Sequence, residues 1–258
     1  MNRPLVFAHR GGADALPEHT LGAYLRAIDE GADGVECDVR LTRDGHLVCV
    51  HDRTVDRTST GHGVVSDFDL DDLRGLDFGS WHATGAEAGI YIEDRDSTEA
   101  PVLTLDRLLQ VVEGTGVRLL IETKHPTRYA GLVEQQLVRL LEKYGVAGAG
   151  SPVTVMSFSP VALRRVRLLA PPLETVLLLE RVPVRRRDGS LPAAADIAGP
   201  GVEILRAHPS YVARVHAQGN RLYVWTVDEP ADIELVLGLG VDAIITNRPT
   251  DVLARLRA

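Results

Sequence analysis

Four short motifs in this sequence carry side chains that could hold a metal ion and move protons. They are His9-Arg10-Gly11-Gly12, Glu36-Cys37-Asp38, His51-Asp52 and Glu122-Thr123-Lys124. Side chains alternate between the two faces of a strand, so Glu36 and Asp38 point the same way and can grip one cation. Two histidines near such a cation, with fixed positive charge beside them, are suited to cleaving a phosphodiester. The motifs therefore predict a metal-dependent catalytic site.

The acids and the histidines would have separate tasks. Hard cations such as Mg²⁺ or Ca²⁺ take carboxylate oxygens, so Glu36, Asp38 and Glu122 make a plausible site for one divalent ion. The ion would neutralise a phosphate and activate an attacking oxygen. Histidine titrates near neutrality, so of His9 and His51 one can remove a proton while the other protonates the leaving alkoxide.

Each motif also has a plainer structural interpretation. A histidine at a strand end is often structural or solvated, and Glu122 with Lys124 could form only a salt bridge. Arg10, however, offers paired donors to phosphate oxygens, and Lys124 offers a compact charge. Glu36 and Asp38 sit inside an otherwise apolar strand, where unpaired charges are costly. Together and in this order, the motifs favour a phosphate-binding site over separate structural roles.

The composition restricts the partners of such a site. The net charge of −8, with histidines neutral, argues against bulk nucleic-acid binding or a basic membrane-surface patch. The first apolar run is too short for a signal peptide and no run approaches membrane-spanning length, so we expect a cytoplasmic protein without stable membrane insertion. Cys37 and Cys49 fall on neighbouring predicted strands; a disulfide is conceivable, and two reduced thiols are favoured.

Apolar strand-like runs alternate with helical patterns nearly to the end of the chain. The predicted strands cover residues 5–9, 34–41, 47–51, 117–122, 153–157, 175–179, 203–207, 221–227 and 243–246. The predicted helices cover residues 21–30, 129–144, 160–169, 210–218, 230–238 and 249–256. Strands separated by helices pair in parallel, and about eight such units in this length favour a (β/α)8 TIM barrel. A doubly wound sheet is the alternative, because periodicity does not separate the two.

Residues 56–100 do not follow this alternation. They are polar, rich in Gly and Asp, and too long for an ordinary loop. We expect a small insertion after the second barrel strand, lying over the barrel mouth, within a single domain of residues 1–258. Its aromatic residues Phe78, Trp81 and Tyr91 are expected to pack within the insertion. The stretch from Arg185 to Pro200 predicts a second long loop.

Further segments match a known pattern in the same order. They are Leu16 to Thr20, Gly31 to Val39, Thr42 to Gly45, Val48 to Asp52, Asp56 to Thr58, Pro101 to Leu105, Ile121 to Lys124, Val224 to Val227 and Val241 to Pro249. With His9-Arg10-Gly11-Gly12, they resemble the glycerophosphodiester phosphodiesterase family over essentially the whole chain. The resemblance implies a TIM barrel, a divalent cation, and hydrolysis of glycerophosphodiesters to glycerol 3-phosphate and an alcohol.

The resemblance also implies roles for individual residues. It implies that His9 and His51 form the acid–base pair and that Glu36, Asp38 and Glu122 are the metal ligands. It also implies that Arg10 and Lys124 contact the phosphate, and that Trp225 lines the substrate end of the pocket. Three positions depart from the family pattern: His19 stands where many members have Asn, Thr123 where Ile is frequent, and Asp228 where Asn is common. We expect His19 to be structural and Asp228 to alter the fit of the alcohol or glycerol.

Two other functions are open. A phospholipase D-type activity on lysophospholipids or sphingolipids would need an exposed apolar rim on the insertion. A non-catalytic protein that binds glycerophosphodiesters is the second alternative, and the intact His9, His51 and acids weigh against it. The expected partner is a small-molecule glycerophosphodiester, not nucleic acid, and the protein is expected to be a monomer or a homodimer.

Overall fold

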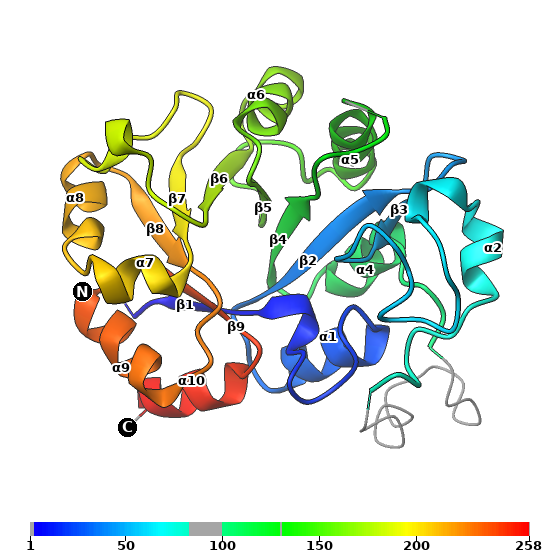
Figure 1. The fold of residues 1–258 in the computed structure, drawn as a ribbon, viewed down its shortest axis with the longest axis horizontal. Coiled ribbons are helices and arrows are strands. Elements are labelled where there is room, and N and C mark those ends of the chain that lie inside the picture. The colour runs from blue at the N-terminus through cyan, green and yellow to red at the C-terminus, as the bar shows by residue number, and fades with distance from the viewer. Residues whose placement is uncertain (1–2, 83–99, 130, 258) are drawn as a thin grey trace.

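Eight parallel strands form a closed ring in the computed structural model of the protein (Figure 1). The structure describes residues 3–82, 100–129 and 131–257. The ring contains, in chain order, β1 (Leu5–Ala8), β2 (Gly34–Leu41), β4 (Arg118–Thr123), β5 (Val153–Ser157), β6 (Glu174–Leu179), β7 (Ile197–Pro200), β8 (Arg221–Val224) and β9 (Ala243–Thr246). It closes because β1 pairs in parallel with both β2 and β9. The predicted (β/α)8 barrel is confirmed.

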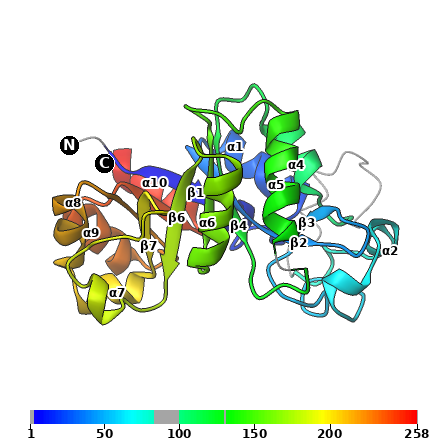
Figure 2. The same cartoon turned by 90° about the horizontal axis from the view of Figure 1, so that it is seen from above.

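Helices cover the outside of the ring. They are α1 (Leu21–Asp29), α4 (Leu105–Val112), α5 (Leu132–Lys143), α6 (Pro160–Leu169), α7 (Val202–Ala207), α8 (Tyr211–Ala217), α9 (Pro230–Leu239) and α10 (Pro249–Arg257). Thr20, Thr104 and Ser159 begin three of them, because each hydroxyl accepts a hydrogen bond from the backbone three residues on. Helices α5 and α6 lie next to each other outside the strands (Figures 1 and 2).

Alternate residues of the strands form an apolar layer inside the ring. The layer consists of Phe7, Leu120, Met156, Val176, Leu178, Ile197, Tyr223, Ala243 and Ile245. The residues between them face outward and pack against the helices. Because side chains along a strand repeat with a period of two, a residue two positions beyond this layer points into the mouth at the carboxyl ends of the strands. This periodicity positions the site.

The segment after β2 adds structure outside the ring. Strand β3 (Leu47–Cys49) pairs antiparallel with β2 through a turn in which Gly45 has a φ of 89°. A short 3₁₀ helix, η2 (Val65–Asp67), and α2 (Leu70–Arg74) follow, and both views place α2 beyond β3 at one side of the molecule (Figures 1 and 2). Phe78 is buried in a small cluster with residues of these elements, whereas 36% of Trp81 is exposed.

Part of the predicted insertion lies outside the described residues. Residues 83–99, which include Tyr91, belong to that part. The placement of residues 56–100 over the barrel mouth therefore stays a prediction. Cys37 and Cys49 are buried, and both thiols are free. Within the described part of the chain, no helix is long and apolar enough to cross a membrane.

One predicted strand is a helix, and one barrel strand was predicted as loop. Residues 203–207 fall within α7, and the strand before it is β7, inside the stretch predicted as a loop from Arg185 to Pro200. The sequence of β7, Ile-Ala-Gly-Pro, has one β-branched residue, because the barrel interior there leaves no room for larger side chains. A Cβ at Gly199 would lie 2.7 Å from Val176 Cγ1 and 2.9 Å from Leu178 Cδ2.

Candidate active site

The predicted site residues meet at one end of the barrel. A pocket of about 170 Å³ opens at the carboxyl ends of the strands. It is lined by His9, Arg10, Glu36, His51, Glu122, Lys124, Met156, Phe158, Leu178, Glu180, Trp225, Thr226 and Ile245. Asp38 is 1% exposed and contacts Lys124 and Arg10 at the edge of this pocket. All eight predicted site residues therefore lie in or against a single pocket.

Three buried carboxylates form a compact cluster. One oxygen from each of Glu36, Asp38 and Glu122 lies within 4.8 Å of the others. Glu36 and Asp38 share the inner face of β2, and Asp38 pairs in register with Glu122 on β4. Burial, reinforced by the charge of Asp38, raises the pKa of Glu122 to about 8 and raises the pKa of Glu36 well above its usual value. Three carboxylate oxygens at this spacing suit a divalent cation, which would favour the ionised form of all three acids.

Two cations already face the cluster. Lys124 Nζ lies 2.9 Å from Asp38 Oδ1 and 2.8 Å from Glu122 Oε1. Arg10 Nε lies 3.1 Å from Asp38 Oδ2. Burial alone would raise the pKa of Asp38, but Lys124, His19 and Arg10 together hold it well below the usual value. When all three acids are ionised, their three negative charges exceed the two positive charges of Lys124 and Arg10 by one. A divalent ion would more than offset this remaining negative charge.

Arg10 adopts a backbone conformation that suits a functional position. Its φ of 53° and ψ of 30° lie in the left-handed region, which costs a non-glycine residue about 1–3 kcal/mol. In this conformation its backbone N–H donates to Glu36 Oε2 at 3.0 Å, and its guanidinium donates to Glu18. The next residue, Gly11, has a φ of 87°, and a Cβ there would lie 2.8 Å from Ala23 Cβ in α1. The His-Arg-Gly-Gly turn therefore packs against α1 and aims Arg10 at the acids.

A short relay orients His9. Asn247 donates from its side-chain Nδ2 to Asp228 Oδ2 at 2.7 Å, so its Oδ1 is the atom 2.8 Å from His9 Nδ1. An oxygen there can only accept, so Nδ1 carries the proton and Nε2, 4.0 Å from Glu36 Oε2, keeps its lone pair. Burial and the charge of Arg10 lower the pKa of His9 to about 3. Asp228 thus holds the partner of His9 and does not line the pocket, contrary to its expected effect on the fit of substrate.

His51 has the matching arrangement. Its Nδ1 lies 2.7 Å from Asp52 Oδ1, so this nitrogen donates to the carboxylate and Nε2 is free for the pocket. Hydrogen bonds from Arg57 hold the pKa of Asp52 well below its usual value, so that carboxylate stays ionised. Arg57 also makes two hydrogen bonds of 2.8 Å to Glu18, the acid that accepts from Arg10. Glu18 thereby connects the His51–Asp52 pair, through Arg57, to Arg10.

His19 is buried beside the acids, as its expected structural role requires. Its Nε2 lies 3.0 Å from Asp38 Oδ2, and its Nδ1 lies 2.7 Å from the hydroxyl of Tyr24. The Tyr24 hydroxyl in turn donates to the backbone oxygen of Glu36. This chain of contacts links the Asp38 carboxylate to the backbone of Glu36.

The far side of the pocket is aromatic and apolar, with one acid. Trp225 donates from its indole to the Gly199 oxygen at 2.7 Å, and Phe158 packs edge-on against it with 5.4 Å between ring centroids. Phe158 and Glu180 were not predicted as site residues. Phe158 lies two positions after the inner apolar residue Met156, and Glu180 lies two positions after Leu178. That period of two is the signal that could have found them.

Comparisons with known proteins agree with this geometry. The model of the glycerophosphoryl diester phosphodiesterase family matches residues 9–251. A probable glycerophosphodiester phosphodiesterase 1 of Mycobacterium tuberculosis is 46% identical over 252 residues, which cover 95% of this chain and 90% of that protein. A glycerophosphodiester phosphodiesterase of Caldanaerobacter subterraneus is 34% identical over 262 residues, with 99% and 98% covered.

Solved structures share the fold at lower identity. A phosphodiesterase of Oleispira antarctica, in complex with its product sn-glycerol-3-phosphate, superposes with a TM-score of 0.86 at 24% identity, covering 99% of this chain and 98% of that one. A putative glycerophosphoryl diester phosphodiesterase of Silicibacter pomeroyi gives 0.82 at 24% identity, with 99% and 95% covered. The sequence matches show the family as well as the fold, because the family model spans residues 9–251 and the two relatives are 46% and 34% identical over nearly the whole chain. The chain belongs to the glycerophosphoryl diester phosphodiesterase family, and hydrolysis of glycerophosphodiesters is its activity.

Proposed function

We propose that the chain hydrolyses glycerophosphodiesters to sn-glycerol 3-phosphate and an alcohol, with one divalent cation and two histidines. The observation that carries this proposal is the pocket itself, which combines a cluster of three buried carboxylates with two imidazoles that each keep a free Nε2. The product named in the Oleispira antarctica complex, sn-glycerol-3-phosphate, supports the choice of product.

Glu36, Asp38 and Glu122 would hold the cation. When bound, it would neutralise the phosphate and polarise the attacking oxygen. Mg²⁺ and Ca²⁺ are both compatible with three carboxylates, and the number and distances of the ligands distinguish the two ions. Arg10 and Lys124, which line the pocket beside these acids, would bind the phosphate oxygens.

The histidines would move the two protons of the reaction. One imidazole Nε2 takes the proton of the attacking oxygen, either water or the glycerol hydroxyl next to the phosphate, as that oxygen bonds to phosphorus. Attack by water gives glycerol 3-phosphate directly, whereas attack by the hydroxyl gives a cyclic phosphate that a water molecule must then open. The other imidazole, protonated at Nε2, gives its proton to the alcohol oxygen as the P–O bond to the alcohol breaks. Asn247 and Asp52 keep the two Nδ1 atoms engaged, so both Nε2 atoms serve the reaction. Trp225 would line the substrate end of the pocket.

Single replacements of the histidines test this proposal. His9→Ala and His51→Ala should each lower glycerol 3-phosphate release by roughly 10²–10⁴-fold while the protein stays folded. His62→Ala is a matched control, because His62 is a solvent-exposed histidine outside the pocket. Near-normal turnover in either pocket variant would contradict the proposed roles.

Substrate panels separate this function from its alternatives. Activity only on lysophospholipids or sphingolipids, stimulated by micelles, would favour the phospholipase D-type reaction. Full affinity for a metal with no turnover on any diester would favour a non-catalytic binding protein. A single catalytic domain over residues 1–258, a cytoplasmic location and a monomeric or homodimeric state stay predictions.

A further inference from the structure

Glu180 is an acid in the catalytic pocket that the proposed mechanism does not use. It directly follows β6, two positions beyond the inner-layer residue Leu178, and it lines the same pocket as His9 and Lys124. Its side chain is exposed. In the part of the chain that the structure describes, it makes no hydrogen bond or ion pair. A carboxylate with no partner therefore faces the space where a negatively charged diester must bind.

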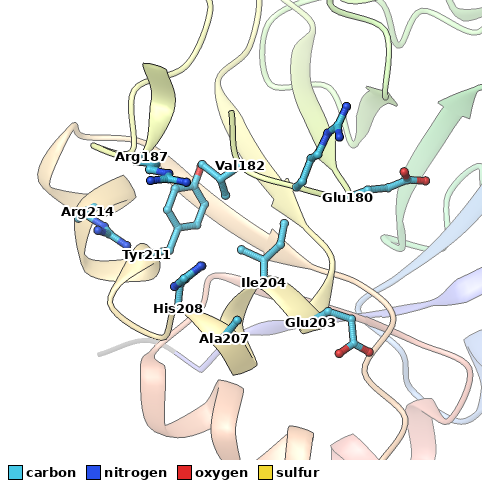
Figure 3. Close-up of a pocket in the computed structure, with 10 residues that line it drawn as sticks. Glu180, Val182, Arg187, Glu203, Ile204, Ala207, His208, Tyr211 and Arg214 are labelled. Atoms are coloured by element: carbon cyan, nitrogen blue, oxygen red, sulfur yellow. The ribbon is translucent and has the colours of Figure 1, made fainter. Parts of the chain in front are cut away.

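Nearby arginines do not neutralise this carboxylate. A second hollow of about 590 Å³ lies on the other side of the same rim, and Arg181, Arg187 and Arg214 are among its lining residues. Figure 3 shows the Glu180 carboxylate directed away from Tyr211, Arg187 and Arg214. Glu203, the other acid in that hollow, pairs with Arg206 at 2.8 Å. Glu180 is thus the acid of this rim that remains available to a ligand in the catalytic pocket.

The surroundings of Glu180 in that pocket are aromatic and apolar. Phe158 is 39% exposed and stands edge-on to Trp225, with 88° between the ring planes. Met156 and Leu178 complete this side. At the phosphate side, Arg10 and Lys124 would contact the phosphate, and the three acids would hold the cation. The pocket therefore has one end suited to an anion and another that combines a negative charge with aromatic faces.

A carboxylate beside aromatic rings binds an ammonium ion better than a neutral polyol. The rings attract a cation electrostatically, and they offer no hydrogen-bond acceptor to hydroxyl groups. A carboxylate near a phosphodiester would repel it unless a positive charge on the substrate lay between them. A diester whose alcohol is itself cationic supplies such a charge next to Glu180, in addition to the charges that Arg10, Lys124 and the cation would place at the phosphate.

We propose that Glu180, with Phe158 and Trp225, binds the ammonium group of the departing alcohol, so that this enzyme prefers diesters of amino alcohols such as choline and ethanolamine. This inference rests on the proposed function, since it assigns the alcohol end of the same pocket. Glu180 is a specificity-determining residue here and takes no part in bond making or breaking.

Glycerophosphocholine and glycerophosphoglycerol, compared as substrates of the metal-supplemented chain, test the inference. The wild-type enzyme should have the higher kcat/KM for glycerophosphocholine, and Glu180→Gln should lower the choline-to-glycerol ratio of kcat/KM by about tenfold. Most of this change should appear in KM, because the ammonium contact is present before the reaction begins. Phe158→Leu should lower the same ratio, because leucine keeps the apolar bulk and removes the aromatic face.

Glu203→Gln is the matched control, because Glu203 lies on the same rim in α7 and already has a partner. Its ratio should equal that of the wild type. An unchanged ratio in Glu180→Gln, with both diesters hydrolysed, would overturn the inference and leave the proposed function standing. Absence of glycerol 3-phosphate from every diester would overturn the proposed function, and this inference with it.

Discussion

The relay from Asp228 through Asn247 to His9 predicts a reciprocal swap. Replacing Asp228 by Asn leaves an oxygen for the backbone N–H of Asn247, which now bonds Asp228 Oδ1 at 2.8 Å. The side-chain nitrogen of the introduced asparagine then faces Asn247 Nδ2, which in the wild type donates to Asp228 Oδ2 at 2.7 Å. Two donors face each other there, and that hydrogen bond is lost. The Asn247 side chain can restore a hydrogen bond to residue 228 by rotating so that its oxygen and nitrogen exchange places. This rotation presents its nitrogen to His9 Nδ1, which must then accept, so the imidazole proton moves to Nε2.

The size of this effect follows from the bond that is lost. A hydrogen bond to a charged group contributes about 1.5–3 kcal/mol, which corresponds to a preference of roughly 10- to 150-fold for one amide orientation. Asp228→Asn should therefore lower kcat/KM by about tenfold or more, with a small change in stability. Asn247→Asp alone sets two carboxylate oxygens at the present donor–acceptor spacing, a repulsion of about 6 kcal/mol at an effective dielectric constant of about 20.

The double variant Asp228→Asn, Asn247→Asp should recover most of the lost activity. In it the amide of residue 228 donates to the carboxylate of residue 247, whose other oxygen accepts from His9 Nδ1 as in the wild type. A double-mutant cycle in kcat/KM measures the coupling, and nitrogen NMR of the His9 ring reports which nitrogen carries the proton. A double variant no more active than the weaker single variant would refute the reasoning.

Three further predictions concern the acids and the tight turn. Burial raises the pKa of Glu18, but the hydrogen bonds of Arg57 and the charge of Arg10 outweigh it and lower that pKa to about 2. Its contribution, about 3 kcal/mol, is therefore present above the unfolded value near 4.3 and lost as pH falls toward 2. Acid unfolding of Glu18→Gln should lack this component, and an unchanged pH dependence would argue against the Arg57 contacts. Glu122→Gln should weaken Ca²⁺ or Mg²⁺ binding by at least about tenfold in calorimetry, because one of three charged ligands is gone; equal affinity would exclude Glu122 from the ion. Gly11→Ala should lower the free energy of unfolding by about 1–3 kcal/mol, because its Cβ would meet Ala23 and its φ is positive; a stability equal to that of wild type in urea unfolding would show that the turn can relax.

Sequence periodicity predicted the barrel and brought the four motifs together because both depend on local patterns. Glu36 and Asp38 lie on one face because they are two residues apart on β2. The cluster with Glu122 depends on strand order and register, which the resemblance supplied and the pairing of Asp38 with Glu122 realises.

Other features depend on tertiary contacts that no local pattern reveals. Residues 203–207 were predicted as a strand, yet the chain turns into α7 at Gly201, and the short strand β7 before it takes that place in the ring. The pairing of Asp228 with Asn247 joins loops after β8 and β9, which are adjacent only in the closed barrel. Asp228 was accordingly expected to affect substrate fit, whereas it positions the partner of His9.

The central claim is that a cation held by Glu36, Asp38 and Glu122 is required for diester hydrolysis. The most direct test measures glycerol 3-phosphate release from glycerophosphodiesters by protein stripped with EDTA, with its metal content determined in the same sample, and then with Mg²⁺ or Ca²⁺ added back. The account predicts loss of release in the stripped protein and recovery with at least one ion, but no recovery at the same ion concentration in Glu122→Gln. Full turnover by protein shown to be free of metal would contradict it.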